Sequence, residues 1–365
     1  MKKVAVLGCT GSIGSTTLSV LRKYKDYFQV VLLANNSKDK ELSALKKEFI
    51  DAKTYCFSKA DDREYLFREE TYSDVDIVVN GIDGIAGLRP SFAALGAGKI
   101  LATANKESLV CAGQFLNKEM KRSGGKIYPL DSEHSAVWQC LYGRDISDVK
   151  KIVLTASGGA FRDLSKEELA SAPAKKALCH PNWKMGKKVT IDCATLVNKG
   201  MEIIEAKRLF GIDDVCALQH SESIVHALIE MKDNSVLASL SVPDMVLPIQ
   251  YALTYPQRME CELPSLDLVK VATLRFAEID VGRFPAFALC SVADRCGDVG
   301  GTVLTAADEV FVHRYLRDEC RFYDISDGIE KALNKFSYKG DFSDVYDVLR
   351  MDKEVREYIL SENCL

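Results

Sequence analysis

The sequence lacks the features that would mark several classes of protein. Its 48 lysines and arginines are outnumbered by 52 aspartates and glutamates, so the net charge is −4 and there is no basic excess for binding nucleic acid. No apolar run approaches the roughly 18 to 20 residues of a membrane span. The chain enters a strand-like run within three residues of its start, which leaves no room for a signal peptide. These absences favour a cytoplasmic protein that binds small molecules and contacts neither nucleic acid nor membrane.

Paired cysteine spacings are also absent. The 12 cysteines are scattered through 365 residues, and no CxxC motif occurs. We therefore predict reduced thiols in a cytoplasmic protein, most of them small core residues such as Cys9, Cys56, Cys111 and Cys140. With 47% hydrophobic residues, a chain of this length can bury a substantial core and divide into two or three domains.

A strand, a glycine turn and a helix open the chain. Residues 2–8 have the pattern of a buried strand, and helical periodicity begins at Ser12. Gly8, Gly11 and Gly14 are spaced as GxxGxxG, which lets the backbone approach a pyrophosphate at a helix N-terminus. A tight turn without a ligand is the alternative.

An acidic residue is missing where an NAD enzyme of this type would need one. The second expected strand covers residues 29–33, and an Asp or Glu at its end normally accepts a hydrogen bond from the ribose 2′-hydroxyl. Residues 34–38 are instead Ala, Asn, Asn, Ser and Lys. Asn36, Ser37 and Lys38 could donate to a 2′-phosphate, so the sequence favours NADP over NAD.

Strand-like runs alternate with helical patterns up to residue 130. This alternation predicts an α/β fold with a Rossmann-like, doubly wound parallel sheet. Asn105, Lys106 and Glu107 follow the carboxyl end of the strand-like run KILATA, on the edge where such sheets bind ligands. We therefore place Lys106 near the nicotinamide. A surface lysine that caps a helix is the alternative.

Three carboxylates predict a metal site. Asp131 and Glu133 follow the strand-like run GKIYPL, and in an extended segment residues two apart point the same way. Two aligned carboxylates repel each other unless a cation or a proton intervenes. Glu202 would complete an all-oxygen ligand set, which suits Mg²⁺ or Mn²⁺ and not Zn²⁺. A simple helix cap at residues 131–133 is the alternative.

The segment 180–206 mixes polar and core residues in an unusual way. Its sequence is HPNWKMGKKVTIDCATLVNKGMEIIEA, and we expect an irregular loop, a strand-like VTID stretch and a helix from Thr195. Asn198, Lys199 and Glu202 share one face of that helix. They form either a solvated ion pair or a site in which Asn198 and Lys199 hold an anion and Glu202 holds a cation.

The sequence also predicts a second phosphate-binding turn, at Ser157, and a helical C-terminal region. Ser157 and the two glycines after it follow a strand and could bind phosphate, with a tight turn as the alternative. His226 has the pattern of a core or surface histidine. Beyond Phe284 the pattern is helical. We expect an N-terminal Rossmann-like domain, a central α+β catalytic domain and a C-terminal helical domain, with the ranges 1–130, 131–256 and 283–365 and a linker at 257–282.

Several long motifs occur in an order that matches one known family. They are GCTGSIG, ATANKESLV, LDSEHSA, LTASGGAFR, HPNWKMG through VNKGMEIIEA, SVPDMVLPIQYALTYPQR and PSLDLVK. With these motifs the chain resembles the 1-deoxy-D-xylulose 5-phosphate reductoisomerase family over essentially its whole length. The resemblance implies an NADPH-dependent enzyme that rearranges 1-deoxy-D-xylulose 5-phosphate and reduces the intermediate aldehyde to 2-C-methyl-D-erythritol 4-phosphate, in isoprenoid precursor synthesis.

The resemblance also implies ligands and site residues. It implies a homodimer and a divalent metal, Mg²⁺ or Mn²⁺ with Co²⁺ as a further candidate, held at the positions Asp131, Glu133 and Glu202. In that family the positions matching His180, Trp183 and Met185 belong to a mobile loop that closes over substrate and cofactor. With the residue arguments above, the other expected catalytic residues are Lys106 and His180. The expected substrate-binding residues are Ser132, Ser157, His180, Trp183, Cys193, Asn198, Lys199 and His220. The expected cofactor-binding residues are Gly8, Thr10, Gly11, Ser12, Ile13, Asn36, Ser37, Lys38, Asn105, Glu107, Met185 and Gly186.

The chain departs from the family pattern at three places. Cys193 replaces a serine whose hydroxyl donates to the substrate phosphate, and a thiol is a much weaker donor, so we expect weaker phosphate binding. HisSerGluSer at 220–223 replaces HPQS and adds the carboxylate of Glu222. TAADE replaces NAANE, which puts Thr305 and Asp308 where amides are usual. These changes leave open a diverged paralogue, either a dehydrogenase of another phosphorylated sugar or a non-catalytic nucleotide-binding regulator.

Overall fold

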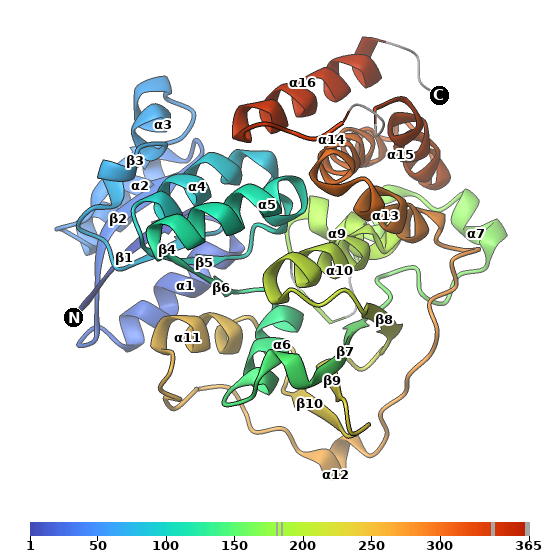
Figure 1. Ribbon diagram of the computed structural model, residues 1–365, viewed down its shortest axis with the longest axis horizontal. Helices are drawn as coiled ribbons and strands as arrows, with labels where there is room; N and C mark the ends of the chain where they lie inside the picture. Colours follow the sequence, from blue (N-terminus) through green and yellow to red (C-terminus); the bar gives the residue numbers. More distant parts are fainter. Residues whose placement is uncertain (180–181, 184, 337–339, 362–365) are drawn as a thin grey trace. The chain divides into compact units, whose positions relative to one another are not determined.

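The computed structural model describes residues 1–179, 182–183, 185–336 and 340–361 and divides into two compact units (Figure 1). The first unit consists of Met1–Ser108, Gln114–Ser135 and Asp244–Leu263. The second consists of Leu109–Gly113, Ala136–Pro243 and Pro264–Leu365. The domain boundaries expected at residues 130, 256 and 282 remain a prediction.

A six-stranded parallel sheet forms the centre of the first unit. Its strands are β1 (Lys2–Leu7), β2 (Phe28–Asn35), β3 (Lys53–Cys56), β4 (Ile77–Asn80), β5 (Ile100–Thr103) and β6 (Lys126–Pro129), in the order β3-β2-β1-β4-β5-β6. β1 pairs with β2 on one side and with β4 on the other, so the strand order reverses between β1 and β4. Doubly wound sheets bind their ligands at such a switch point. The Rossmann-like sheet predicted from the sequence is confirmed.

Helices cover both faces of this sheet. They are α1 (Ser12–Lys23), α2 (Asp39–Glu48), α3 (Ala60–Leu66), α4 (Leu88–Gly96), α5 (Lys106–Ser123) and α11 (Val246–Thr254), with short 3₁₀ turns η1 (Glu69–Tyr72) and η2 (Gly84–Gly87). Figure 1 shows α1 and α4 on opposite faces. Because both faces are covered, a central strand of this sheet can be buried on both sides, and every residue of β4 is buried. α1 packs against α11, which comes from a distant part of the chain.

The second unit contains a mixed four-stranded sheet. Its strands are β7 (Val149–Ala156), β8 (Val215–Gln219), β9 (Val225–Met231) and β10 (Val236–Leu240), in the order β10-β9-β7-β8. β7 runs parallel to β8 and antiparallel to β9. Helices α6 (Ser132–Leu141) and α10 (Val197–Phe210) supply Val137 and Ala206 to the core of this sheet, where they meet Ile152 and Ile229.

The C-terminal part of the second unit is helical, as predicted. It consists of α13 (Pro285–Arg295), α14 (Gly297–Leu316), α15 (Phe322–Phe336) and α16 (Val345–Ser361). α14 packs against the other three helices, and one continuous core joins them to α9 (Lys187–Thr195) and α10. The remaining short helices are η3 (Ile146–Asp148), α7 (Lys166–Ala170), α8 (Ala174–Ala177) and α12 (Leu268–Val271). The expected α/β class, with a central α+β region and C-terminal helices, is confirmed.

Two local expectations were wrong. The VTID stretch at 189–192 lies inside α9, because Ile191 and Ala194 pack at helical spacing into the helical core. Glu133 is not extended, because α6 already begins at Ser132 and places Glu133 in its first turn. Among the residues that the structure describes, no helix has the length and apolar character needed to cross a bilayer.

Candidate functional site

A helix N-terminus lies at the carboxyl end of β1. Gly8 has a φ of +76°, and a Cβ atom there would lie 2.4 Å from the carbonyl oxygen of Gly81. A Cβ atom on Gly14 would lie 2.2 Å from the carbonyl oxygen of Gly8, so both glycines allow close packing of strand, turn and helix. No side chain caps the first turn of α1, and Gly11 and Ser12 are exposed. The first N–H groups of α1 are therefore available to an anion. The expected cofactor residues here are consecutive, namely Thr10, Gly11, Ser12 and Ile13.

The turn after β2 offers donors and no carboxylate. Asn36, Ser37 and Lys38 are all exposed. The Asn35 side-chain amide donates to the carbonyl of Lys38 at 2.8 Å and so orders the turn. The next carboxylate, Asp39, lies 3.4 Å from the Lys59 ammonium. This arrangement suits a ribose 2′-phosphate better than a 2′-hydroxyl.

Asn105 and Glu107 hold loops of the first unit together. Asn105 is 2% exposed, and its side-chain amide donates to the carbonyls of Ile82 and Gly84, each at 2.8 Å. It also accepts from the Ser108 amide at 3.1 Å as the N-cap of α5. Glu107 accepts from Asn105 at 3.2 Å. Both side chains therefore have structural partners, and their role in cofactor binding remains a prediction.

Lys106 and Asp131 form an ion pair at the carboxyl ends of β5 and β6. The Lys106 ammonium lies 2.8 Å from a carboxylate oxygen of Asp131, and their side chains are 11% and 13% exposed. Adjacent parallel strands bring the two residues together, since Thr103 pairs with Pro129. The alternative of an exposed capping lysine is therefore wrong.

The first turn of α6 continues this cluster. The Ser132 hydroxyl donates to the Glu133 carboxylate, and the Asp131 carbonyl accepts from the Ser135 amide at 2.8 Å. His134 is fully buried, with Nδ1 3.9 Å from the Asp131 carboxylate. No role was assigned to His134 from the sequence. Its spacing of three from Asp131 was the available signal, because such residues meet once the helix is recognised.

In the second unit, the turn after β7 lies against α9. Gly158 and Gly159 both have positive φ, at +81° and +66°, and the Ser157 hydroxyl accepts from the Gly159 amide at 3.2 Å. A Cβ atom on Gly159 would lie 2.5 Å from the carbonyl oxygen of Cys193. The turn that carries Ser157 therefore packs against the backbone of Cys193, a second residue expected to bind phosphate.

The face of α10 formed by Asn198, Lys199 and Glu202 is buried. These residues are 9%, 3% and 1% exposed, so the interpretation as a solvated ion pair is wrong. The Asn198 amide and the Lys199 ammonium each donate to one oxygen of the Glu202 carboxylate. No side chain caps α10 and its first turn contains no acidic residue, which together with Lys199 favours an anion there.

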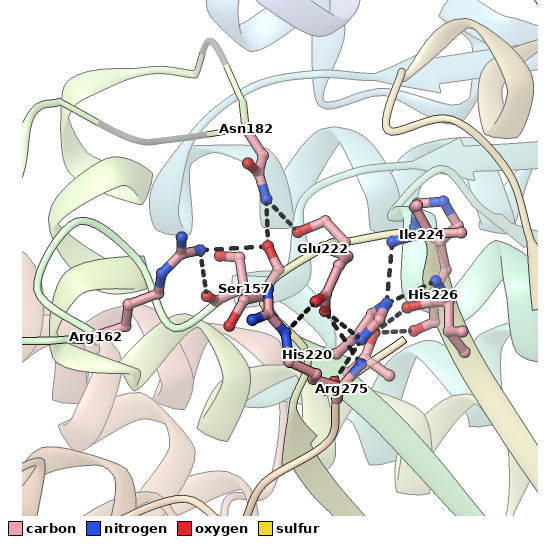
Figure 2. Close-up of polar contacts among 12 residues, drawn as sticks. Ser157, Arg162, Asn182, His220, Glu222, Ile224, His226 and Arg275 are labelled. Atoms are coloured by element: carbon pink, nitrogen blue, oxygen red, sulfur yellow. Dashed lines mark hydrogen bonds and ion pairs between the residues drawn. The ribbon is translucent and has the colours of Figure 1, made fainter. Parts of the chain in front are cut away.

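The loop between β8 and β9 contains His220, and Asn182 from the segment before α9 contacts it (Figure 2). His220 is fully buried, and its Nε2 accepts from the amides of Ile224 and Val225 at 3.2 and 3.1 Å. Its Nδ1 lies 2.8 Å from the Arg275 carbonyl, so both ring nitrogens face backbone groups and substrate binding by His220 stays a prediction. The Trp183 ring lies 6.3 Å from the ring of His226. His226 is buried, so of the two alternatives left open by the sequence, a core or a surface histidine, the first is correct.

The remaining expected residues precede α9. Met185 is partly buried, and Gly186 is the N-cap of α9, whose carbonyl accepts from the Thr190 hydroxyl at 2.7 Å. His180 lies outside the described residues. Asp131 and Glu133 belong to the first unit and Glu202 to the second. The metal site formed by these three carboxylates, like the other site assignments, stays a prediction.

Each added carboxylate has a cationic partner. Glu222 lies 2.7 Å from the Arg275 guanidinium. Partial burial opposes its ionisation, but the hydrogen bonds from Arg275 hold the pKa of Glu222 below its ordinary value. Asp308 is fully buried and lies 2.8 Å from the Lys188 ammonium, which is also 2.7 Å from Asp192. Neither departure therefore leaves an unpaired charge.

Comparisons with known proteins cover almost the whole chain. The model of 1-deoxy-D-xylulose 5-phosphate reductoisomerase matches residues 4–70 and 53–113, and that of its C-terminal domain matches residues 127–210. A further model, the DXP reductoisomerase C-terminal domain, matches residues 240–358. A reductoisomerase of this name from Clostridium botulinum (strain Hall) is 40% identical over 380 residues, covering 98% of each chain. The protein of the same name from Desulforamulus reducens is 40% identical over 379 residues, covering 98% of this chain and 97% of its own.

Solved structures give the same result. A crystal structure of DOX-P reductoisomerase in complex with NADPH, fosmidomycin and magnesium has a TM-score of 0.93 at 36% identity, and covers 99% of this chain and 98% of its own. The 1-deoxy-D-xylulose 5-phosphate reductoisomerase of Zymomonas mobilis in complex with NADPH has a TM-score of 0.88 at 35% identity, with 97% of each chain covered. The chain described above therefore belongs to the 1-deoxy-D-xylulose 5-phosphate reductoisomerase family.

Proposed function

We propose that the chain is an NADPH-dependent reductoisomerase that converts 1-deoxy-D-xylulose 5-phosphate to 2-C-methyl-D-erythritol 4-phosphate with a divalent metal, in isoprenoid precursor synthesis. The observation that carries this proposal is the 40% identity to reductoisomerases over 98% of the chain. The relatives of known structure were solved with NADPH or magnesium. The comparisons do not favour either of the two alternatives, a dehydrogenase of another sugar phosphate or a regulator without turnover.

The first unit would hold the cofactor. The uncapped N-terminus of α1 would bind the pyrophosphate, and Asn36, Ser37 and Lys38 would bind the 2′-phosphate. When bound, NADPH supplies the hydride that reduces the aldehyde. Lys106, at the end of β5, lies at the strand edge where doubly wound sheets place their ligands.

Asp131, Glu133 and Glu202 would hold the metal. Their donor set consists of carboxylate oxygens alone, which fits Mg²⁺ or Mn²⁺, with Co²⁺ as a further candidate. Such an ion, when bound, polarises the substrate carbonyl and stabilises negative charge on its oxygens. Lys106 and Lys199 already place a positive charge beside Asp131 and Glu202. Each lysine would keep its carboxylate oriented between rounds of metal binding.

The remaining residues would position the substrate and exclude water. Ser157, Asn198 and Lys199 would bind its phosphate, with Cys193 contributing a weak donor. Lys106 and Ser132 would donate hydrogen bonds to the oxygens of the sugar chain. Trp183 and Met185 would cover the reacting atoms, because hydride transfer needs a site without bulk water. We further propose a cytoplasmic homodimer.

The test is to follow NADPH absorbance with 1-deoxy-D-xylulose 5-phosphate and Mg²⁺. We expect NADPH oxidation that a chelator abolishes and that Mg²⁺ restores, with 2-C-methyl-D-erythritol 4-phosphate as the product by mass spectrometry. Turnover with another phosphorylated sugar alone would assign a different dehydrogenase. Binding of NADPH without turnover of any sugar phosphate would instead support the regulator.

A further inference from the structure

The loop between β8 and β9 joins three segments of the second unit that are distant in the sequence (Figure 2). Its residues 220–223 contact Asn182, which comes from the segment before α9. They contact Arg162, which follows the Ser157 turn, and Arg275, which comes from the segment between α12 and α13. This loop is also the place where the chain departs from the family pattern by carrying Ser221 and Glu222.

The carbonyl oxygen of Ser221 accepts from two of these segments. The Asn182 side-chain amide donates to it at 2.9 Å, and the Arg162 guanidinium donates at 3.3 Å. The orientation of the Asn182 amide follows from this contact, since its oxygen could not face another carbonyl oxygen. Arg162 also donates to the Ser157 carbonyl at 3.4 Å. One backbone oxygen thus links Asn182 to the turn expected to bind phosphate.

Ser223 is the second acceptor for Asn182. Its hydroxyl lies 2.7 Å from the Asn182 side-chain nitrogen, and the residue is 7% exposed. The backbone of Ser223 has a φ of +54°, in the left-handed region that side chains other than glycine rarely adopt. Strain of this kind persists only where the surrounding contacts hold the residue, and it clusters at functional sites.

Glu222, His220 and Arg275 hold the loop in this conformation. Glu222 accepts from the Arg275 guanidinium at 2.7 Å, and its other oxygen lies 3.2 Å from His220 Nδ1. Because His220 Nε2 accepts two backbone hydrogen bonds, the ring proton is on Nδ1, where it can donate to the Arg275 carbonyl at 2.8 Å and to Glu222. The ring of Phe276 stacks on that of His220 at 4.8 Å, and Ala277 pairs with Gln219. The segment 275–277 is therefore fastened to both ends of the loop.

We propose that Ser221–Ser223 forms a binding site for the Asn182 side chain, which we call the seat. The ion pair between Glu222 and Arg275 is a positioning element that holds the seat in its conformation. The proposal rests on the proposed function, because Asn182 directly precedes Trp183, which we expect to cover the substrate. The seat would keep Trp183 next to His226 and near the Ser157 turn. Neither Glu222 nor Arg275 needs to touch the substrate, so their loss should weaken substrate binding more than turnover.

An ordinary surface ion pair is the competing explanation. The Arg275 side chain is 76% exposed, and most exposed pairs contribute little because water and salt screen them. Glu222 differs from a surface carboxylate because its side chain is 15% exposed and it also faces His220. A variant of another ion pair on the same sheet separates the two explanations. Glu230 pairs with Lys150 at 2.6 Å and lies near the end of β9, whereas the loop precedes the start of that strand. Glu230→Gln is therefore the matched control.

The experiment uses the full chain with Trp138→Phe, which leaves Trp183 as the single tryptophan of the two in the sequence. In this background we compare Ser223→Ala, Glu222→Gln, Arg275→Gln and the Glu230→Gln control. The readouts are acrylamide quenching of Trp183 in the free protein, and kcat and KM with 1-deoxy-D-xylulose 5-phosphate. The first readout needs no activity, and it reports directly on the position of Trp183.

We expect Ser223→Ala to increase the quenching of Trp183 and to raise KM about fivefold, as for the loss of one hydrogen bond, with kcat changed less than about twofold. Glu222→Gln and Arg275→Gln should each raise KM about twofold to threefold, as for a partly solvated ion pair. The two should not add in the double variant, since they break one pair. Ser223→Gly removes the hydroxyl but relieves the backbone strain, so it tests the contact if Ser223→Ala folds poorly.

The outcomes separate the seat from the proposed function. If Ser223→Ala, Ser223→Gly and Glu222→Gln all leave quenching and KM as in Glu230→Gln, the seat does not exist, whatever the activity. If Asn182→Ala and Ser223→Ala act additively, the two residues do not work through one contact, and the proposal is overturned. If quenching changes as expected but no variant or parent protein turns over the substrate, the seat stands and the proposed function fails.

Discussion

Two lysine–carboxylate pairs with little solvent exposure, one in each unit, differ in how the chain forms them. Lys106 and Asp131 are 25 residues apart and meet because β5 and β6 are neighbours in the parallel sheet. Lys199 and Glu202 are one turn apart on α10 and would meet in any helix. The first pair keeps some contact with solvent, with side chains 11% and 13% exposed, whereas those of the second are 4% and 2% exposed.

This difference shows that the spacing of two paired residues and their burial have separate origins. The spacing of Lys199 and Glu202 can be seen in the sequence, but their burial cannot, because burial depends on the core that α9, α10 and α13–α16 share. The pairing of Lys106 with Asp131 depends on sheet order instead. We therefore expect the two pairs to matter similarly for activity and unequally for stability.

The largest expected effect is on activity, where the two pairs should behave alike. Asp131→Asn and Glu202→Gln each replace one carboxylate of the proposed metal site with a neutral amide. We expect each to lower kcat/KM by about 10³-fold or more, because a bound metal contributes several kcal/mol to transition-state stabilisation. Steady-state NADPH oxidation at saturating Mg²⁺ measures this, with Glu230→Gln as the control.

A loss of activity in only one of these two variants would break the comparison. If Asp131→Asn were inactive and Glu202→Gln nearly normal, then Glu202 would serve only as the partner of Lys199. Isothermal titration with Mn²⁺ provides a readout that does not depend on turnover, and both variants should lose metal affinity.

The next effect is on stability, where the pairs should differ. Lys199→Met removes the ammonium that pairs with Glu202, which is 1% exposed, and breaking a buried pair of this kind costs about 3 kcal/mol or more of unfolding free energy. Lys106→Met leaves Asp131 in partial contact with water, so we expect a cost of about 1 kcal/mol. Urea unfolding of both variants without substrate or metal measures the two free energies.

If Lys199→Met and Lys106→Met lowered the unfolding free energy equally, solvent exposure would not decide the strength of these pairs. A double variant tests whether the loss in Lys199→Met comes from the remaining charge of Glu202. The double variant Lys199→Met with Glu202→Leu removes both charges, so it should recover most of the stability that Lys199→Met loses. Failure to recover it would point to packing of the lysine stem and not to an unpaired charge.

The fold was easier to predict than the site because strand and helix patterns are local. Alternating apolar runs and the Gly8–Gly14 turn were enough to predict the parallel sheet, and the position of Lys106 followed from its topology. VTID was misassigned because a short apolar run suits a strand or a helix equally well. Glu133 was placed in an extended segment because the start of α6 was not recognised at Ser132.

Contacts between distant segments could not be predicted. The interaction of Asn182 with Ser221 and Ser223 joins residues about forty positions apart. The partner of Glu222, Arg275, lies in an irregular segment with no periodic pattern. From the sequence, Glu222 was an added carboxylate with no identifiable partner, whereas in the structure it belongs to an ion pair.

A smaller effect is expected at Cys193, on α9. Because a hydroxyl donates a stronger hydrogen bond than a thiol, Cys193→Ser should lower KM for the phosphorylated substrate about fivefold. We expect kcat to stay within about twofold, since phosphate binding is uniform between ground and transition states. Cys179→Ser at an exposed position is the control. An unchanged KM would mean that Cys193 does not reach the phosphate, although its backbone lies against the Ser157 turn.

The smallest expected effect extends the comparison to a third, more exposed pair, Glu222 with Arg275. Partial burial raises the pKa of Glu222, but the hydrogen bonds it accepts, above all from Arg275, outweigh this and leave the pKa below its ordinary value. The folded state therefore binds this proton less tightly than the unfolded state. The resulting stability is present above the ordinary glutamate pKa of about 4.3, and it is lost as the pH falls through the lower, folded-state pKa. Because the pair is partly solvated, its contribution to the unfolding free energy should be below about 1 kcal/mol.

This contribution can be measured by urea unfolding of the parent protein and of Glu222→Gln at several pH values from neutral down to that range. The difference between the two proteins should be largest near neutral pH and shrink toward acid, and it should also shrink in high salt. A difference that stays constant with pH and salt would show that the Glu222 side chain acts through packing and hydrogen bonding, and not through its charge.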